Sequence, residues 1–292
     1  MLDGNENGVS ADEPSSTARF TAMCRGRHRR EDAPPWVLDD THALDLIGPG
    51  WTGLADALDG VLPEPARSRM RAGMVARSRY VEDRLLAGHF GQYVLLGAGL
   101  DTFAWRRPDL LGGLRVYEVD HPATLSWKWA RAAELGWPVA DGHVFTPIDL
   151  EHETLGTGLD RAGFDWSAPA CFAWLGVTQY LTRDAVLGTL ETIAACPPGT
   201  EIVFTYVVPP ELLDDVGRLC FDTLSAVAAR SGETWHTVLR PDEAHDLVEQ
   251  QSALTVREHL GARDMHERYF ADRADGLTPY STIGYIAAGV PS

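Results

Sequence analysis

The amino-acid sequence predicts a doubly wound α/β fold with a mostly parallel, seven-stranded sheet. Three observations carry this prediction. From residue 92 onward, short apolar runs alternate with stretches of helical periodicity. The first run leads into a glycine turn, LLGAGLDT, at residues 95–102. The 292 residues are 45% hydrophobic, which supports a sizeable buried core. Strands that alternate with helices run parallel and carry helices on both faces of the sheet.

The expected strands follow one another along the chain, at residues 92–99, 114–120, 143–150, 170–177, 200–208, 253–260 and 282–290. Between them, residues 121–136 are predicted as a helix with Leu125, Trp129 and Ala132 on one face. Residues 182–196 are predicted as a second helix that begins at Thr182, a good N-cap residue. Residues 209–250 are expected to be mostly helical, as an insertion that could form a lid.

The first 90 residues differ in character from the rest. Residues 1–16 are rich in Gly, Ser, Asn and acidic residues, which predicts a disordered tail. Residues 17–90 are expected to form an N-terminal helical cap on a catalytic domain at 91–292. A basic cluster lies on the first predicted helix and is either a solvated face or a lid that attracts an anionic acceptor; it comprises Arg19, Arg25, Arg27, Arg29 and Arg30.

Charge and cysteine content exclude several classes of protein. The chain has 42 acidic and 25 basic residues, a net charge of −17, which disfavours nucleic acids and anionic membranes as partners. No apolar run approaches the roughly 18 residues that span a bilayer, and the polar start does not resemble a signal peptide. The four cysteines are far apart, so neither a metal site nor a disulfide framework is predicted. A cytoplasmic location is expected.

The glycine turn marks the expected ligand site. In a doubly wound sheet, ligands bind beyond the carboxyl ends of the strands, where the strand order reverses. Gly97 and Gly99 allow a sharp turn and close approach of a ligand to the backbone. The dinucleotide fingerprint has a third glycine where this chain has Thr102, so a cofactor without a pyrophosphate is favoured.

Two acidic residues follow neighbouring predicted strands. Asp120 ends the second strand, where its carboxylate can accept hydrogen bonds from both hydroxyls of a ribose. Asp149 lies at the end of the third strand and is expected to bind the exocyclic amine of adenine, with the backbone N–H of Leu150 at a ring nitrogen. This pattern favours an adenosine ligand that carries a positive sulfonium.

Three segments, LLGAGLDTFAWR (95–106), YEVDHP (117–122) followed by Lys128, and PIDL (147–150), resemble the leucine carboxyl methyltransferase family. That family includes a phosphatase-methylating enzyme, many actinobacterial methyltransferases and polyketide carboxyl O-methyltransferases. The resemblance implies a class I methyltransferase sheet and S-adenosyl-L-methionine as the cofactor. It also implies that Gly97 lines the methionine part of the cofactor, with Ala98 and Gly99 in the same cofactor-binding turn.

The resemblance assigns further cofactor-binding residues. Arg77, in VARSRYVED (75–83), matches an arginine that pairs with the cofactor carboxylate, a role suited to the two-pronged guanidinium. The chain departs from the family at Leu175, where a glutamate that contacts the cofactor amine or the adjacent site is usual. The family's glycine and tyrosine are retained at Gly176 and Tyr180.

The expected reaction is O-methylation of a carboxylate or phenol on a small-molecule or peptide natural product, with an anionic acceptor. A carboxylate needs no general base, whereas a phenol, with a pKa of about 10, is helped by one, and the sequence contains no obvious base. Tyr180, Tyr206 and His121 are the candidate catalytic residues, with core packing or loop shaping as the alternative role. A nicotinamide-dependent oxidoreductase and a non-catalytic cofactor-binding protein remain the alternative functions.

Overall fold

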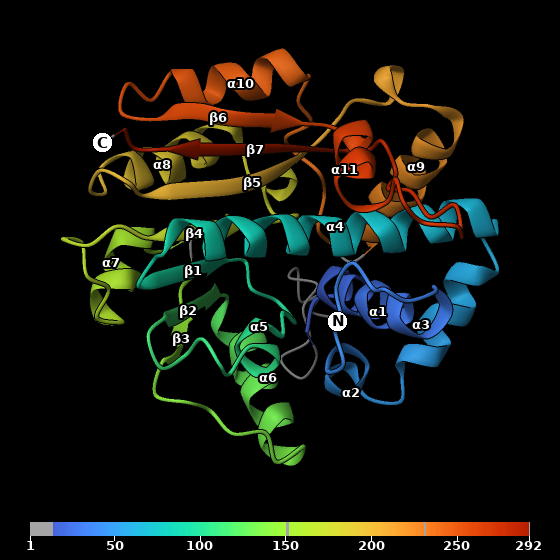
Figure 1. The fold of residues 1–292 in the computed structure, drawn as a ribbon, viewed down its shortest axis with the longest axis horizontal. Coiled ribbons are helices and arrows are strands. Elements are labelled where there is room, and N and C mark those ends of the chain that lie inside the picture. The colour runs from blue at the N-terminus through green and yellow to red at the C-terminus, as the bar shows by residue number, and fades with distance from the viewer. Residues whose placement is uncertain (1–13, 150–151, 231, 292) are drawn as a thin grey trace, which may run out of the picture.

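The computed structural model describes residues 14–149, 152–230 and 232–291. Its centre is a seven-stranded sheet in the order β3-β2-β1-β4-β5-β7-β6 (Figure 1). The first five strands are parallel, and β7 runs antiparallel to both β5 and β6. The predicted fold class is therefore confirmed. The strands are β1 (Gln92–Leu96), β2 (Arg115–Asp120), β3 (His143–Pro147), β4 (Cys171–Trp174), β5 (Glu201–Val207), β6 (Thr255–Leu260) and β7 (Ile283–Gly289).

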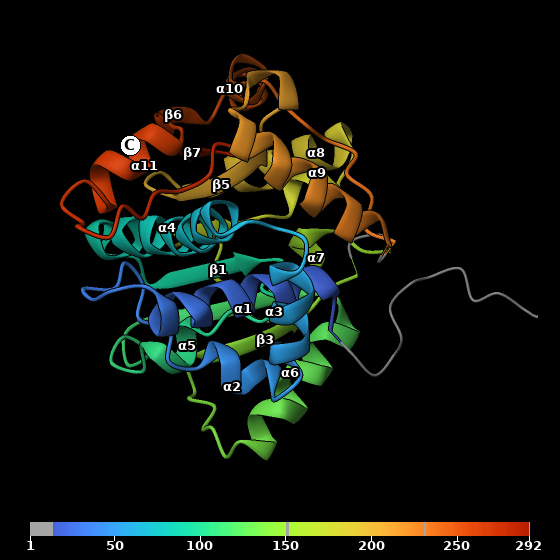
Figure 2. The same ribbon diagram turned by 90° about the vertical axis from the view of Figure 1, so that its right-hand side faces the viewer.

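Helices cover both faces of this sheet. One core cluster joins the sheet to α1–α5, and the other joins it to α7, α8 and α10. Figure 2 shows α1, α2 and α3 on the same side of the molecule as α5 and α6. The helices are α1 (Ser16–Glu31), α2 (Ala43–Ile47), α3 (Trp51–Asp59), α4 (Glu64–Gly88), α5 (Phe103–Arg106), α6 (Pro122–Glu134), α7 (Leu155–Arg161), α8 (Arg183–Ala194), α9 (Asp215–Arg230), α10 (Pro241–Glu249) and α11 (Ala262–Tyr269), with 3₁₀ turns η1 (Thr178–Tyr180) and η2 (Pro210–Leu212).

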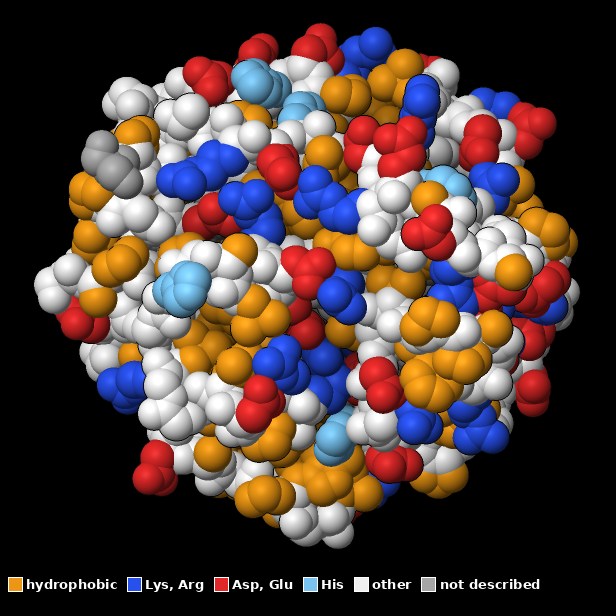
Figure 3. All heavy atoms as spheres, in the orientation of Figure 1, with side chains coloured by type: hydrophobic (Ala, Val, Ile, Leu, Met, Phe, Trp, Pro, Cys, Tyr) orange, Lys and Arg blue, Asp and Glu red, His pale blue; other side chains and the backbone are white. Residues whose placement is uncertain are grey.

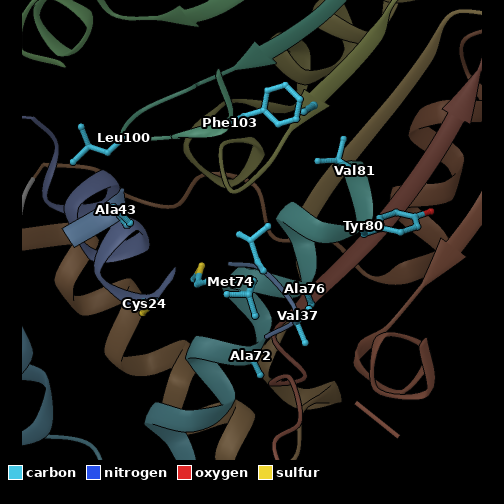
Figure 4. Packing of buried hydrophobic residues seen from close by; sticks show 14 of the residues in the cluster. Cys24, Val37, Ala43, Ala72, Met74, Ala76, Tyr80, Val81, Leu100 and Phe103 are labelled. Atoms are coloured by element: carbon cyan, nitrogen blue, oxygen red, sulfur yellow. The ribbon is translucent and has the colours of Figure 1, made fainter. Parts of the chain in front are cut away.

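The long helix α4 connects the N-terminal helices to the sheet. It lies alongside the strands in Figure 1, and Figure 4 shows its residues Met74 and Ala76 among the other buried hydrophobic residues. A Cβ atom at Gly73 would lie 2.1 Å from Cε1 of Tyr280, so this position admits no larger residue. Complete burial of a side chain such as Met74 contributes about 1.5–3 kcal/mol. The helices at residues 16–88 are thus packed into the main core.

Several element boundaries differ from those predicted. Helix α1 begins at Ser16, Ser15 caps it by accepting from the backbone N–H of Thr17, and Pro14 is buried, so the predicted disorder is wrong for residues 14–16. Residues 1–13 lie outside the described residues. Residues 17–90 form four separate helices, and in the segment 209–250 the described residues 232–240 are not helical.

The strands also end earlier than predicted. Residues 97–99, 148–149 and 175–177 leave the sheet after β1, β3 and β4. Their apolar and glycine content resembles strand sequence, but at the carboxyl edge of the sheet the backbone turns away. Two of these turns line the cavity described below.

The basic cluster on α1 is only partly solvated. Arg25 is buried and its Nε lies 2.8 Å from Oδ2 of Asp40, and Arg27 is buried with its Nη1 2.8 Å from Oδ1 of Asp59. The prediction of a solvated face is wrong for these two arginines, which link α1 to the segments that follow it. On the face drawn in Figure 3, acidic and basic side chains are intermingled. No helix in the described part of the chain is both long and apolar enough to cross a membrane.

Candidate functional site

A cavity of about 260 Å³ lies at the carboxyl ends of β1, β4 and β5. Strand β1 pairs with β2 on one side and β4 on the other, so the cavity lies where the strand order reverses. This is the position at which open α/β sheets bind ligands. Its walls come from the glycine turn, Asp120, residues 175–180, helices α1 and α4, and the segment after α9.

The glycine turn has the backbone conformation that its sequence predicts. Gly97 and Gly99 have φ angles of +67° and +48°, in the left-handed region that favours glycine. A Cβ atom at Gly97 would lie 2.3 Å from Cγ2 of Val177. The backbone N–H groups of Gly97 and Ala98 both donate to the carbonyl of Val119, at 2.9 and 3.0 Å. The turn is therefore held against β2 and presents its bare backbone to the cavity.

Asp120 joins the glycine turn to the tip of β2. Its Oδ2 accepts from the backbone N–H of Gly99 and its Oδ1 from that of His121, both at 2.7 Å. Burial raises the pKa of Asp120, and these two N–H donors oppose that rise. Each carboxylate oxygen can accept a further hydrogen bond, so Asp120 can still bind two ligand hydroxyls.

Asp120 follows a strand that contains a second buried carboxylate, Glu118, which contacts Lys128 and His143. Lys128 Nζ donates to Oε2 of Glu118 at 2.5 Å, and Nε2 of His143 lies 3.0 Å from Oε1 of the same carboxylate. Burial opposes ionisation of Glu118, but Lys128 and His143 hold its pKa below the ordinary value. The positive charge of Lys128 also acts on Asp120. Lys128, which follows the YEVDHP segment, thus belongs to the support of the strand tip.

A second buried network holds the other side of the glycine turn. Thr102, at the position of the dinucleotide fingerprint's third glycine, donates to Oδ2 of Asp40 at 2.8 Å. Arg25 bonds the same carboxylate and also donates to the carbonyl of Leu100 at 2.6 Å. Arg106 donates to Thr102 and pairs with Glu82 of α4 at 2.6 Å. Helices α1 and α4 therefore hold this loop from outside the sheet.

Arg77 of α4 is the unusual charge in the cavity. Its side chain is buried, with 7% of the residue exposed, and it donates one long hydrogen bond, 3.4 Å, to Oγ1 of Thr21. Among the described residues, no carboxylate lies within ion-pair distance of it. Burial lowers the pKa of Arg77. Gly176 permits this placement, since a Cβ atom there would lie 2.4 Å from Nη1 of Arg77. A buried guanidinium without a carboxylate partner is suited to an anionic ligand group.

The three candidate catalytic residues have different surroundings. Tyr180, in η1, lines the cavity, and burial together with the charge of Glu233 raises its pKa. Tyr206 also lines the cavity, but its hydroxyl lies 2.7 Å from Nε2 of His259 on β6. The side chain of His121 is 56% exposed and caps α6, and His121 is not among the residues that line the cavity. The structure therefore places Tyr180 and Tyr206 at the cavity and leaves His121 outside it.

Asp149, expected at the adenine, is not among the residues that line the cavity. The side chain of Asp149 is 32% exposed and Oδ2 is 2.9 Å from Nδ1 of His152. Leu150 lies outside the described residues. Leu175 lines the cavity, so an apolar side chain occupies the position where the resemblance implies a carboxylate.

Glu233 and Trp235 are among the polar residues of the cavity that the sequence did not predict. Glu233 accepts a hydrogen bond of 2.7 Å from Oγ1 of Thr17, which is 216 positions away in the chain. Neither residue belongs to a motif, and no local spacing indicates their contact with α1.

Comparisons with known proteins agree with this architecture. Residues 18–194 match the family model of leucine carboxyl methyltransferases. YktD of Bacillus subtilis, provisionally named an S-adenosyl-L-methionine-dependent methyltransferase, is 31% identical over 302 aligned positions that cover 94% of this chain and 98% of YktD. A provisionally named methyltransferase of Mycobacterium tuberculosis is 31% identical and covers 68% of each chain.

A solved structure shares the fold. The crystal structure of a DUF574 family protein from Streptomyces avermitilis superposes with a TM-score of 0.61 and 16% sequence identity, covering 96% of this chain and 99% of the other. The predicted family, enzyme class and cofactor are confirmed by the family match and the full-length relative. The chain belongs to the leucine carboxyl methyltransferase family, a family of S-adenosylmethionine-dependent methyltransferases.

Proposed function

We propose that this protein is a cytoplasmic O-methyltransferase that transfers the methyl group of S-adenosylmethionine to a carboxylate or phenol of a small-molecule or peptide natural product. The observation that carries the cofactor assignment is the buried guanidinium of Arg77, which faces the cavity without a carboxylate partner among the described residues. The cofactor has a carboxylate that this guanidinium would pair with.

The other cavity residues fit the remaining parts of that cofactor. Asp120 retains lone pairs for the two ribose hydroxyls, and the turn at Gly97–Gly99 allows the ligand to contact the backbone. Asp149 and Leu150 are proposed at the adenine because of their position after the third strand in the sequence and because of the family resemblance. When bound, S-adenosylmethionine supplies an electrophilic methyl group on a sulfonium. The chain then has to hold the acceptor oxygen about 3 Å from that methyl group, in line with the S–C bond, and exclude water.

The nicotinamide alternative is disfavoured by the loop that follows the glycine turn. Thr102 is buried and hydrogen-bonded to Asp40, and the helix after it, α5, has only four residues. A pyrophosphate site of the dinucleotide type needs a third glycine there and a helix N-terminus to face the phosphates. A non-catalytic family member, the other alternative, is disfavoured by the methyltransferase family to which the chain belongs, and only the apolar Leu175 supports it.

Calorimetry and turnover separate these functions. Purified protein is titrated with S-adenosylhomocysteine and, separately, with NADH. Binding of S-adenosylhomocysteine alone supports the proposal, and binding of NADH alone contradicts it. Transfer of label from S-adenosylmethionine, labelled in its methyl group, to an added phenol or carboxylic acid would exclude the non-catalytic alternative.

A further inference from the structure

A carboxylate that the proposed cofactor does not require lies in the same cavity. Helix α9 ends at Arg230, and Gly232 takes a left-handed φ of +78°. The backbone N–H of Glu233 then donates to the carbonyl of Ala228 at 2.9 Å, the pattern of a helix that a glycine terminates. This helix end fixes the backbone of Glu233, whose side chain lines the cavity.

A residue on the opposite wall of the cavity orients the side chain of Glu233. Thr17, in the first turn of α1, donates from Oγ1 to Oε2 of Glu233 at 2.7 Å. Within the described residues, Glu233 forms no ion pair with an arginine, lysine or histidine. The nearby titratable group is Tyr180, which also lines the cavity. Glu233 is therefore a positioned carboxylate without a neutralising cation in the described structure.

Trp235 places a hydrogen-bond donor in the same wall. Its ring packs edge-to-face against Phe221 of α9, with 5.1 Å between centroids. The next two backbone N–H groups, of His236 and Thr237, donate to the carbonyl of Gln179 at 2.7 and 3.2 Å, which fixes the segment against η1. The indole Nε1 of Trp235 is buried, makes no hydrogen bond of ordinary geometry within the described structure, and lies near enough to the Tyr180 hydroxyl to oppose the rise of that group's pKa. A buried donor without an acceptor destabilises the fold, and a ligand that accepts its hydrogen bond removes that cost.

We propose that the methyl acceptor is a phenol and that Glu233 is the general base that accepts its proton. The inference rests on the proposed function. The phenolic O–H bond breaks as the proton moves to Glu233, an oxygen electron pair forms the new O–CH₃ bond, and the S–CH₃ bond breaks with its electrons on sulfur. The products are the methyl ether, S-adenosylhomocysteine and protonated Glu233, which returns its proton to solvent.

The charges in the cavity favour a phenol over the other acceptor classes. A carboxylate acceptor is ionised at neutral pH, gains nothing from a base, and is repelled by Glu233. A phenol brings the proton that Glu233 can accept, and its oxygen can take the hydrogen bond that Trp235 offers. Apolar side chains from α1 and α9, including Phe20 and Leu224, also line the cavity and suit an aromatic ring.

The test uses Glu233→Gln, which keeps the shape of the side chain and removes its basicity. The matched control is Glu267→Gln on α11, whose exposed carboxylate pairs, within the described residues, with Arg263 at 3.0 Å. Wild type and both variants are assayed with labelled S-adenosylmethionine against para-substituted phenols, a nitrophenol that is ionised at the assay pH, anilines and benzoates. Affinity for S-adenosylhomocysteine is measured by calorimetry in all three proteins.

We expect wild type to methylate phenols in preference to benzoates and anilines. Glu233→Gln should lower kcat for un-ionised phenols by about 10²–10⁴-fold, the usual contribution of a general base, and much less for the ionised nitrophenol. Its affinity for S-adenosylhomocysteine should stay within about twofold of wild type, and Glu267→Gln should behave as wild type.

Four outcomes would overturn the inference. Two concern wild type: methylation of benzoates or anilines in preference to phenols, and no turnover of any of the acceptors. Two concern Glu233→Gln: an equal loss of rate for ionised and un-ionised phenols, and a loss of affinity for S-adenosylhomocysteine. The last would make Glu233 a partner of the cofactor amine instead of a base. Failure of the proposed function itself is distinguishable, because wild type would then not bind S-adenosylhomocysteine.

Discussion

Replacing Arg77 with methionine tests the site at its most unusual residue. Methionine preserves an unbranched side chain of similar reach but removes the guanidinium. Arg77 is 7% exposed and has no carboxylate partner among the described residues, so its charge is a cost to the ligand-free protein. The same charge would become favourable once a ligand carboxylate pairs with it. The variant should therefore change stability and binding in opposite directions.

The expected magnitudes follow from burial. A ligand carboxylate that loses a bidentate, buried guanidinium loses about 3 kcal/mol, which corresponds to roughly a 100-fold weaker affinity for S-adenosylhomocysteine. Without ligand, removal of the unpaired buried charge should stabilise the fold by about 1–2 kcal/mol, or a few degrees in Tm. The increase in Tm on adding S-adenosylhomocysteine should shrink in Arg77→Met.

Differential scanning fluorimetry and calorimetry measure both effects. Unchanged affinity would show that Arg77 does not contact the cofactor carboxylate. A lower Tm of the ligand-free variant would show that Arg77 stabilises the fold through contacts other than an ion pair, and would refute the reasoning from burial.

Three further predictions concern the turn, the acids and the loop network. Gly97→Ala should lower Tm, because a left-handed φ of +67° costs a non-glycine residue about 1–2 kcal/mol and the added Cβ would lie 2.3 Å from Val177; a melting curve equal to wild type would contradict this. In calorimetry, Asp120→Ala should weaken S-adenosylhomocysteine binding more than Asp149→Ala, since Asp120 lines the cavity and Asp149 does not. The opposite ranking would exclude Asp120 as the residue that binds the ribose. Burial opposes ionisation of Asp40, but two neighbouring arginines hold its pKa below the ordinary value. The ionised form of Asp40 therefore stabilises the fold above a pH of about 4, and this contribution is lost as the pH falls through the lowered pKa. In urea melts, the loss in free energy of unfolding caused by Asp40→Asn should be largest at pH 7 and should shrink in acid.

The expectations that came from local pattern agree best with the structure. Alternating apolar runs and helical stretches predicted the seven strands and their class of sheet, and the glycines at 97 and 99 predicted a sharp turn, which the structure makes with left-handed φ angles. Three strands were predicted to extend too far, because apolar residues that turn away at the carboxyl edge of the sheet resemble residues that continue in it. The Thr182 cap was predicted from residue type and is present, accepting from the backbone N–H of Ala185.

The expectations for side-chain partners fared less well. Arg106 pairs with Glu82 on α4, which lies 24 positions away in the chain. Tyr206 was expected to face the acceptor, and its hydroxyl contacts His259 on the edge strand β6. Both outcomes depend on which helix or strand packs beside the residue, and spacing along the chain does not encode that choice.

By itself, the sequence determined the class of fold, the glycine turn, the acid at the tip of β2 and the family, because each depends on residues that are neighbours or lie one strand apart. Only the tertiary structure decided that no carboxylate of the described residues lies beside Arg77 and that Glu233 and Trp235 close the cavity across from Thr17. The physical reason is that unpaired charges and cavity walls are properties of packing between distant segments. In this protein, the residues suited to select the acceptor, Glu233 and Trp235, are brought to the cavity by contacts between segments that are far apart in the sequence.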